Sequence, residues 1–380
     1  GLHVVHIRAL LPTVQAALRQ WAVVWLWARQ SVRLGGAMRR LRAGHRHFLI
    51  CAMTLPVYAV AFSWAPLIAG SVEDEAYPLL RAGALAQAPL IDGRVAPPEW
   101  PAAAITGLLD LQTGVLTREQ PVFLIAYDAT CLYAAARVPL PLGAEPQTTI
   151  TNRDGPVWED DAVELFLDPS HSHRDYFQFI VNAAGVAYDG RRRDGSWNCN
   201  LRCAAQRLAG EWNVELAVPW SDLGLTGPPL RSPMGLNLCW DRVTPSKVLC
   251  TWAPLSSNFH EPEHFGHLLL WPEGPLPQLT ALDQPWTGKW ALAASLVAEK
   301  KDRALLTAEV RREQEAAPLW QQEQSLAPGS AALLAGSLPG GDDAPDAGRY
   351  LLRYCISADS EVLARAMVPF EVPEQFKVAL

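Results

Sequence analysis

Several patterns that mark well-known chemistries are missing from this sequence of 380 residues. It has no Cys-x-x-Cys pair and no cysteine and histidine set at zinc-finger spacing, which excludes the common structural zinc sites. No glycine-rich phosphate-binding loop and no internal repeat occur, which argues against a nucleotide-binding domain and a repeat array. The net charge is −7 and the basic clusters at 39–46 and 191–193 are short, so nothing indicates a nucleic-acid partner.

Long amphipathic segments are also scarce, whereas proline and tryptophan are abundant. The chain contains 31 prolines and 15 tryptophans, more than an average composition gives. Many prolines favour short strands and loops over helices. Tryptophan can fill a β core, and it can also form an exposed platform for a flat, weakly polar ligand such as a sugar ring.

The N-terminal part has the order of an export address. Residues 1–37 precede a plausible start at Met38 and are treated as an upstream extension. A basic segment at 38–47 is followed by an uncharged apolar run at 48–70, small residues and an acidic stretch at 73–75. This order predicts a signal peptide over 38–71, with an uncleaved membrane-anchor helix as the alternative. We therefore expect a secreted, cell-surface or periplasmic protein that meets a membrane only through this segment.

Export would permit disulfide bonds among the cysteines. Of the seven cysteines, Cys51 lies in the apolar run, which leaves six. Cys239 and Cys250 flank an expected turn and could face each other across it. The sequence leaves two possibilities open, namely buried free thiols and a single bridge.

The rest of the chain is predicted to be all-β, with two sandwiches in series. From 85 to 272, short strand-like runs alternate with turn residues, which is typical of an antiparallel β-sandwich. A proline-rich stretch at 273–285 is expected to be a linker. Six further strand-like runs within 286–373 predict an immunoglobulin-like or fibronectin-like sandwich.

Strand alternation separates a core face from a polar face in the first sandwich. In the run 162–168, Val163, Leu165 and Leu167 point one way and Glu164 points the other. The polar faces of this run and its neighbours carry a carboxylate and amides, which suit the hydroxyl groups of a sugar. A plain solvent-exposed sheet face is the alternative, and it would make the chain a spacer or adhesion segment of a larger surface protein.

Eight segments in order carry a family resemblance: 91–100, 123–133, 157–168, 176–182, 212–219, 235–237, 251–253 and 259–266. They include an Ile-Asp-Gly opening, a Trp-(x)₅-Glu strand and a Phe-Gly ending. In this order and spacing, residues 90–272 resemble the family 9 carbohydrate-binding modules, which are DOMON-like β-sandwiches of the jelly-roll type.

The resemblance implies a non-catalytic module that binds a polysaccharide or oligosaccharide. It implies that Trp158 and Trp252 hold a sugar between two indole faces, while Glu164, Gln178 and Asn182 bind its hydroxyl groups. It also implies structural calcium, for which Asp154, Asp160 and Asp161 are the candidate ligands. One departure is Ile180, where well-studied members often carry a basic residue. The expected role is to target an attached glycoside hydrolase or a similar polysaccharide-degrading protein to its glycan.

Two other chemistries follow from particular residues. Glu164 with Asp241 or Glu215 could form a glycosidase pair of carboxylates. The wider superfamily includes haem-binding sandwiches, for which Met234 with His260, His264 or His267 are the candidate axial ligands.

Overall fold

The structure is a computed structural model that describes residues 77–283, 285–299, 301–339 and 345–374. Its regular structure consists of strands and short 3-10 helices, and no α-helix occurs in these ranges. The all-β prediction is therefore confirmed for the described residues. The predicted signal peptide or anchor over 38–71 and the extension over 1–37 lie outside them. Within the described ranges, no helix has the length and apolar character needed to span a membrane.

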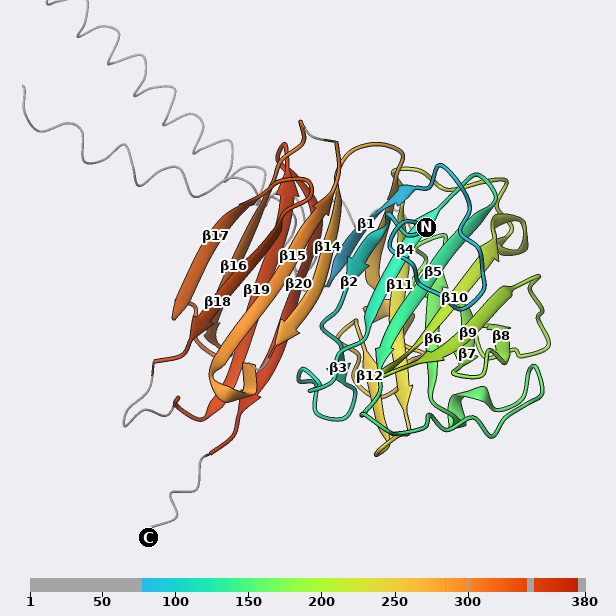
Figure 1. Cartoon of the computed structure of the whole chain (residues 1–380), viewed down its shortest axis with the longest axis horizontal. Helices are drawn as coiled ribbons and strands as arrows, with labels where there is room; N and C mark the ends of the chain where they lie inside the picture. Colours follow the sequence, from blue (N-terminus) through green and yellow to red (C-terminus); the bar gives the residue numbers. More distant parts are fainter. Residues whose placement is uncertain (1–76, 284, 300, 340–344, 375–380) are drawn as a thin grey trace, which may run out of the picture. The chain divides into compact units, whose positions relative to one another are not determined.

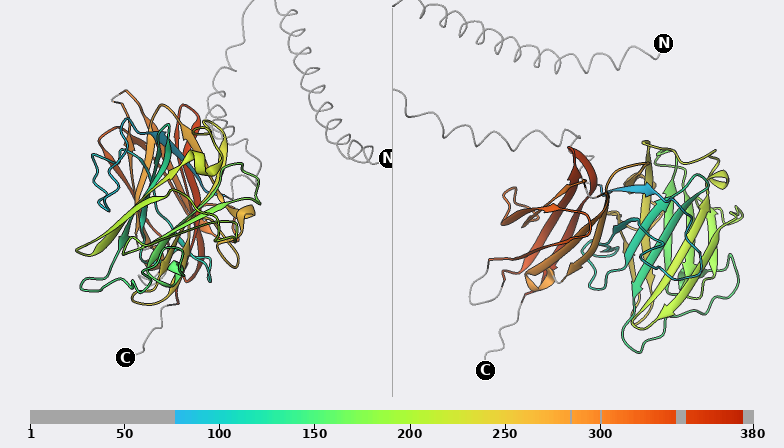
Figure 2. Two further views of the ribbon diagram at one scale, coloured as in Figure 1. Left: turned by 90° about the vertical axis from the view of Figure 1, so that its right-hand side faces the viewer. Right: turned by 45° about the horizontal axis from the view of Figure 1, so that its top comes forward.

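The first sandwich consists of two sheets that share one core, drawn in blue to yellow in Figures 1 and 2. Its strands are antiparallel except β1, which runs parallel to β13 and, at its end, to β4. One sheet has the order β8 (Ala187–Arg191), β7 (Phe177–Asn182), β6 (Ala162–Asp168), β11 (Pro233–Arg242), β13 (Gly266–Trp271) and β1 (Leu79–Ala84). The other has the order β9 (Arg202–Leu208), β10 (Glu211–Pro219), β5 (Cys131–Pro139), β4 (Val122–Tyr127) and β2 (Ala103–Ile105). Short β12 (Val248–Thr251) pairs with β11 and with β3 (Leu109–Asp110).

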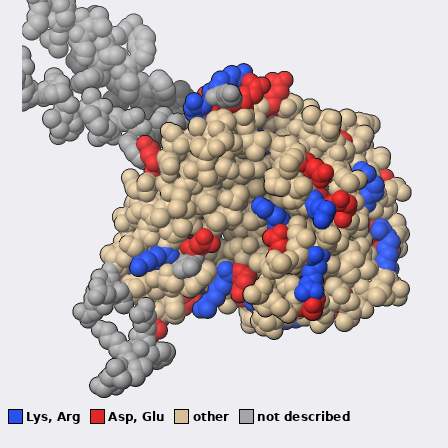
Figure 3. All heavy atoms as spheres, viewed as in Figure 1, with Lys and Arg blue, Asp and Glu red and all other residues tan. Residues whose placement is uncertain are grey.

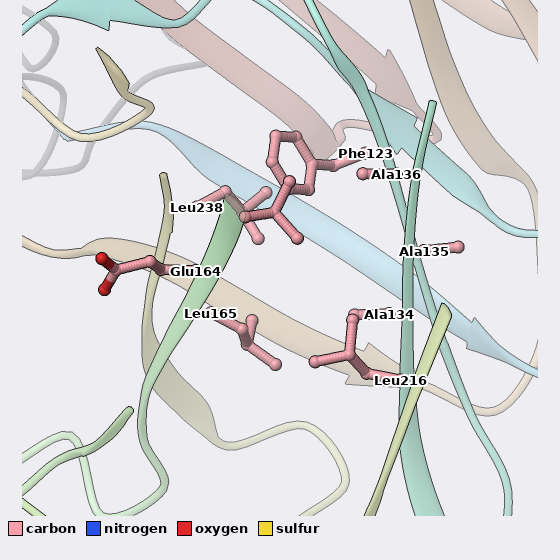
Figure 4. Close-up of a pocket in the computed structure, with 9 residues that line it drawn as sticks. Phe123, Ala134, Ala135, Ala136, Glu164, Leu165, Leu216 and Leu238 are labelled. Atoms are coloured by element: carbon pink, nitrogen blue, oxygen red, sulfur yellow. The ribbon is translucent and has the colours of Figure 1, made fainter. Parts of the chain in front are cut away.

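Strand alternation in β6 produces two faces of different chemistry. Val163, Leu165 and Leu167 are buried in the core between the sheets, together with Phe179 of β7. Figure 4 shows that Glu164 and Leu165 leave their strand on opposite sides, with Leu165 among the apolar residues. Burial of each large apolar side chain contributes about 1.5–3 kcal/mol, so the register that puts the leucines inside fixes Glu164 on the outer face.

The outer face of this sheet is only partly open to solvent. Phe166, which shares the face with Glu164, packs against Phe259 and Phe265 of the 253–265 loop in a small second cluster. The loop thus covers one end of the face and leaves a cleft beside the buried Glu164.

The Ile-Asp-Gly opening of the domain is anchored by a buried carboxylate. Glu215 of β10 accepts hydrogen bonds from Trp100 Nε1 at 2.8 Å and from the backbone N–H groups of Asp92 at 3.0 Å and Gly93 at 2.8 Å. Gly93 has a φ of +86°, and a Cβ there would lie 2.7 Å from the backbone of Ala205. Glu215 therefore has a structural role, because its carboxylate is the acceptor for all three of these N–H donors.

The second sandwich has a three-stranded and a four-stranded sheet. The first contains β14 (Leu276–Asp283), β15 (Lys289–Val297) and β18 (Ala331–Ser337). The second has the order β17 (Trp320–Leu326), β16 (Ala304–Arg312), β19 (Gly348–Ala358) and β20 (Glu361–Val372). Two residues of β1 pair with β20, and Gln278 of β14 pairs with Ala104 of β2.

The expected linker over 273–285 needs correction, because residues 276–283 form strand β14. Leu276, Leu279 and Leu282 are buried, so this stretch contributes to the second sandwich despite its prolines. Pro277 is tolerated because β14 pairs along its length with β15 alone and makes only a single pair with β2.

On the face of the molecule shown in Figure 3, Lys and Arg are interspersed with Asp and Glu.

Replacing the anchor carboxylate should destabilise the fold. Glu215→Ala leaves three buried or part-buried N–H donors without an acceptor, so we expect the free energy of unfolding to fall by about 3 kcal/mol. Urea denaturation followed by circular dichroism measures it. Glu211→Ala on the same strand is the matched control, expected within about 0.5 kcal/mol of the parent chain. Equal effects of the two substitutions would contradict the anchoring role.

Candidate ligand-binding cleft

A cleft of about 440 Å³ opens on the outer face of the sheet that contains β6. Three buried polar side chains from neighbouring strands reach it: Glu164 of β6, Gln178 of β7 and Asp241 of β11. Side chains that are less buried surround them. The other lining residues are Leu111, Trp158, Tyr188, Arg193, Lys247, Leu249, Ser257, Asn258, Phe259 and His260.

The buried polar groups of the cleft are hydrogen-bonded to one another. Gln178 Nε2 donates to Glu164 Oε2 at 2.7 Å, and the carboxyl groups of Glu164 and Asp241 are within hydrogen-bonding reach of each other. Burial raises the pKa of both acids, and the charge of Glu164 raises the pKa of Asp241 further. Burial and mutual repulsion therefore both disfavour the state in which the two carboxyl groups are ionised at once.

Trp158 provides an exposed aromatic surface at the cleft. It lies on the 3-10 helix η2 (Val157–Glu159), and 42% of the residue is exposed. Its ring contacts the edge of Tyr188 at a centroid distance of 5.4 Å and an interplanar angle of 87°. The structure thus brings together three of the five predicted sugar-binding residues, namely Trp158, Glu164 and Gln178.

Trp252 is not at the cleft, and the prediction that it forms a second sugar-binding face is corrected. It is 3% exposed and packs in the core between the sheets, like Cys250 two residues before it. Thr251 between them points to the outer face, where it hydrogen-bonds Asn237. Alternation after β12 therefore directs Trp252 inward.

Phe259 and His260 take the place expected for a second aromatic wall. The ring of His260 packs edge-on against Phe166 at a centroid distance of 5.4 Å, and its Nδ1 pairs with the Tyr176 hydroxyl at 2.8 Å. Burial, with the charge of Arg193, lowers the pKa of His260 to about 4. At neutral pH it is an uncharged aromatic ring with a polar edge. The only sequence indication was its place in the Phe259–Gly266 family segment.

The loop that carries this wall is held by Glu261. Its carboxylate accepts hydrogen bonds from the backbone N–H groups of Ser256, Ser257 and Asn258 and from both serine hydroxyls. Although burial opposes ionisation, these hydrogen bonds hold the pKa of Glu261 well below its usual range. The loop conformation is thus set before any ligand arrives.

Asn182 does not line the cleft either. Its side-chain Nδ2 donates to Asp160 Oδ2 at 2.9 Å and to the carbonyl of Ile150 at 3.1 Å, and its Oδ1 accepts from the backbone of Ala184 and Val186. Its Oδ1 thus holds the turn after β7, and its Nδ2 ties this turn to Ile150 and Asp160. The predicted role in sugar binding is therefore replaced by a structural one.

The residues expected to bind calcium face hydrogen-bond donors. Asp160 accepts from the backbone of Thr149 and Ile150, and Asp161 accepts from the backbone of Gln147, Val243 and Thr244. Asp154 lies 3.6 Å from the guanidinium of Arg153. Calcium requires six to eight converging oxygen ligands, and this donor set does not fit it. No group of three or more potential metal-ligating side chains occurs among the described residues.

The geometry does not support the glycosidase alternative. Glu164 and Asp241 are in direct contact, whereas catalytic pairs lie about 5–9.5 Å apart to accommodate the anomeric carbon. Glu215 is committed to the anchor described above.

The haem and disulfide alternatives fail on strand register. Met234 is buried in the core opposite Leu268, whereas His267 is opposite Gly235 and so lies on the other face of the sheet. His260 lines the cleft on that outer face, and His264 pairs with Glu261 in the loop. Cys250 is opposite Trp240 in the core, whereas Cys239 is on the outer face. Cys239 and Cys250 are free thiols.

The two tryptophans should differ in their contribution to stability. Trp252→Ala creates a core cavity and is expected to lower the free energy of unfolding by about 3–5 kcal/mol. Trp158→Ala removes an exposed ring and should cost less than about 1 kcal/mol. Urea denaturation followed by circular dichroism separates them, and a large loss in the Trp158 variant would show that its ring is structural.

Removal of divalent cations should leave the fold unchanged. Because Asp160 and Asp161 are saturated by N–H donors, we expect the same Tm with EDTA and with added calcium. Differential scanning calorimetry of the full chain measures it. A Tm that falls in EDTA and recovers on adding calcium would contradict this assignment.

Comparison with known proteins agrees with the fold of this domain. Residues 91–272 match the family model described as "Carbohydrate family 9 binding domain-like". No curated protein matches the chain.

Similar solved structures include a Bacteroides uniformis protein with a proposed carbohydrate-binding role, at 17% identity and a TM-score of 0.44, covering 51% of this chain and 100% of that one. A family 9 carbohydrate-binding module from Caldicellulosiruptor kristjanssonii in complex with cellotriose has 18% identity and a TM-score of 0.39, covering 52% and 95%. The same organism's module in complex with glucose has 18% identity and a TM-score of 0.38, covering 51% and 97%. On the match to the family model, residues 91–272 form a family 9 carbohydrate-binding domain, which is a non-catalytic type of domain.

Proposed function

We propose that this chain binds a carbohydrate in the cleft between Trp158 and the Phe259–His260 wall. The observation that carries the proposal is an exposed indole face beside three buried hydrogen-bonding side chains, Glu164, Gln178 and Asp241. A spacer segment would have no need to hold two acids and an amide in a cleft, where burial without a ligand is costly.

The chemistry of the cleft suits a pyranose ring. The C–H face of the sugar stacks on Trp158, while hydroxyl groups at the ring edge donate to the carboxyl oxygens and bond to Gln178. The volume of about 440 Å³ lies within the usual range of small-molecule sites. Because the contact is small and partly hydrated, we expect a Kd of about 10 μM to 1 mM.

The second sandwich supports a role in a larger exported protein. Its three-plus-four arrangement of strands agrees with an immunoglobulin-like or fibronectin-like domain. With the predicted export segment at 38–71, we infer a secreted, cell-surface or periplasmic protein. The binding domain would then hold a polysaccharide-degrading partner, such as a glycoside hydrolase, close to a plant or microbial β-glycan.

Loss of the exposed indole should weaken sugar binding without loss of the fold. For Trp158→Ala we expect at least about a tenfold weaker affinity, since the stacked face contributes more than about 1.4 kcal/mol. A glycan array with neutral β-glycans, followed by calorimetry with glucose and cellotriose, measures it. Trp320→Ala in the second sandwich is the matched tryptophan control and should bind as the parent chain does. The proposal is wrong if the parent chain retains no glycan, or if Trp158→Ala binds as tightly as Trp320→Ala.

A further inference from the structure

Glu164 and Asp241 are placed together by the register of β6 and β11. Glu164 is opposite Cys239, and Asp241 is opposite Ala162, so the two acids are diagonal neighbours on the outer face. The residues are 3% and 2% exposed, and both line the cleft. Carboxyl groups that are buried and in contact repel each other unless a proton lies between them.

The pair has acceptor capacity that the protein does not use. Gln178 occupies Oε2 of Glu164. Asp241 Oδ2 is buried and accepts no hydrogen bond from a donor in the described part of the chain. One shared proton occupies one oxygen of each acid, and the remaining lone pairs belong to two carboxyl groups on adjacent strands that both line the cleft.

We propose that Glu164 and Asp241 hold one proton between them and accept hydrogen bonds from two neighbouring hydroxyl groups of the sugar. Asp241 is then a specificity-determining residue for a vicinal diol. The inference rests on the carbohydrate function proposed above. It adds that the site recognises a vicinal diol and that the two acids share one proton.

Several charged or titratable groups surround the pair and affect its proton. Lys247, in the loop after β11, favours the ionised form of Asp241, while Asp161 beside β6 opposes it. The charge of Glu164 is also felt by Tyr188 of β8 and by Cys239 of β11, and burial raises the pKa of both. His260 and Arg193 line the same cleft from two loops. The proton between the acids is therefore tested by comparing variants rather than from one pH curve.

The first test measures the proton without any ligand. The folded chain holds a proton that the unfolded chain releases above about pH 4, so the stability from the pair is present at low pH and lost as pH rises. Between the unfolded pKa of about 4 and the raised pKa of the pair, the unfolding equilibrium constant of the parent chain should rise with pH, by up to about tenfold per pH unit, relative to Asp241→Asn. The Asn amide donates permanently to Glu164 and needs no proton. Glu164→Gln should flatten the curve in the same way, which provides a second variant if the first folds poorly.

The second test asks whether the site recognises a vicinal diol. Calorimetry on the full chain measures its affinity for glucose, 2-deoxyglucose and 3-deoxyglucose. We expect the parent chain to bind at least one deoxy sugar about tenfold more weakly than glucose, and Asp241→Ala to lose about tenfold for glucose and to lose that preference.

The outcomes separate the two proposals. A chain that binds glucose equally well with Asp241→Ala overturns the inference and leaves the carbohydrate function standing. Parallel stability curves for the parent, Asp241→Asn and Glu164→Gln overturn the shared proton. A parent chain that binds neither glucose nor any glycan on the array, yet shows the predicted pH difference, overturns the carbohydrate function and keeps the acid pair.

Discussion

The cost of burying a carboxyl group organises this domain. An ionised acid taken out of water must find donors, a counter-charge or a proton, and each buried acid here meets that demand differently. Glu215 accepts three N–H groups from the opening segment, and Glu261 accepts five donors from its own loop. Glu164 and Asp241 instead meet each other, with one amide from Gln178. This pair lines an open cleft, whereas Glu215 and Glu261 are each satisfied by donors of the protein itself.

The satisfied acids determine the shape of the cleft around the unsatisfied pair. Asp160 and Asp161 bind the backbone at 147–150 and lie directly after η2, which carries Trp158. Glu261 fixes the turn that presents Phe259 and His260. Both aromatic walls are thus positioned by buried carboxylates with backbone donors. A ligand would meet a preorganised site and would pay little conformational entropy on the protein side.

The two walls differ in chemistry as well as in position. Trp158 offers a large exposed indole face, whereas His260 is mostly buried, uncharged at neutral pH and hydrogen-bonded to Tyr176. A sugar between them would meet one strongly stacking face and one weaker face with a polar edge. Glu164 and Asp241 would then determine the orientation of the sugar, because hydrogen bonds to this pair depend on which hydroxyl groups of the ring face them. In the proposed complex, affinity would come mainly from the indole and selectivity from the carboxyl groups.

The sequence by itself determined the all-β class, the strand at 162–168 and the face on which Glu164 lies, because apolar side chains at alternate positions allow one register only. It also indicated Trp158 and Gln178, which sit in or beside that pattern. The positions and partners of the Trp252, Asn182 and Asp160 side chains were determined only by the tertiary structure. Trp252 follows the end of a strand, where alternation depends on the path of the loop, and Asn182 and Asp160 are satisfied by each other across two turns. The encounter of Glu164 with Asp241, 77 positions apart in sequence, depends on the pairing of β6 with β11. A pattern of residues fixes the face of a strand, but the neighbour across the ladder is fixed only by the folded sheet.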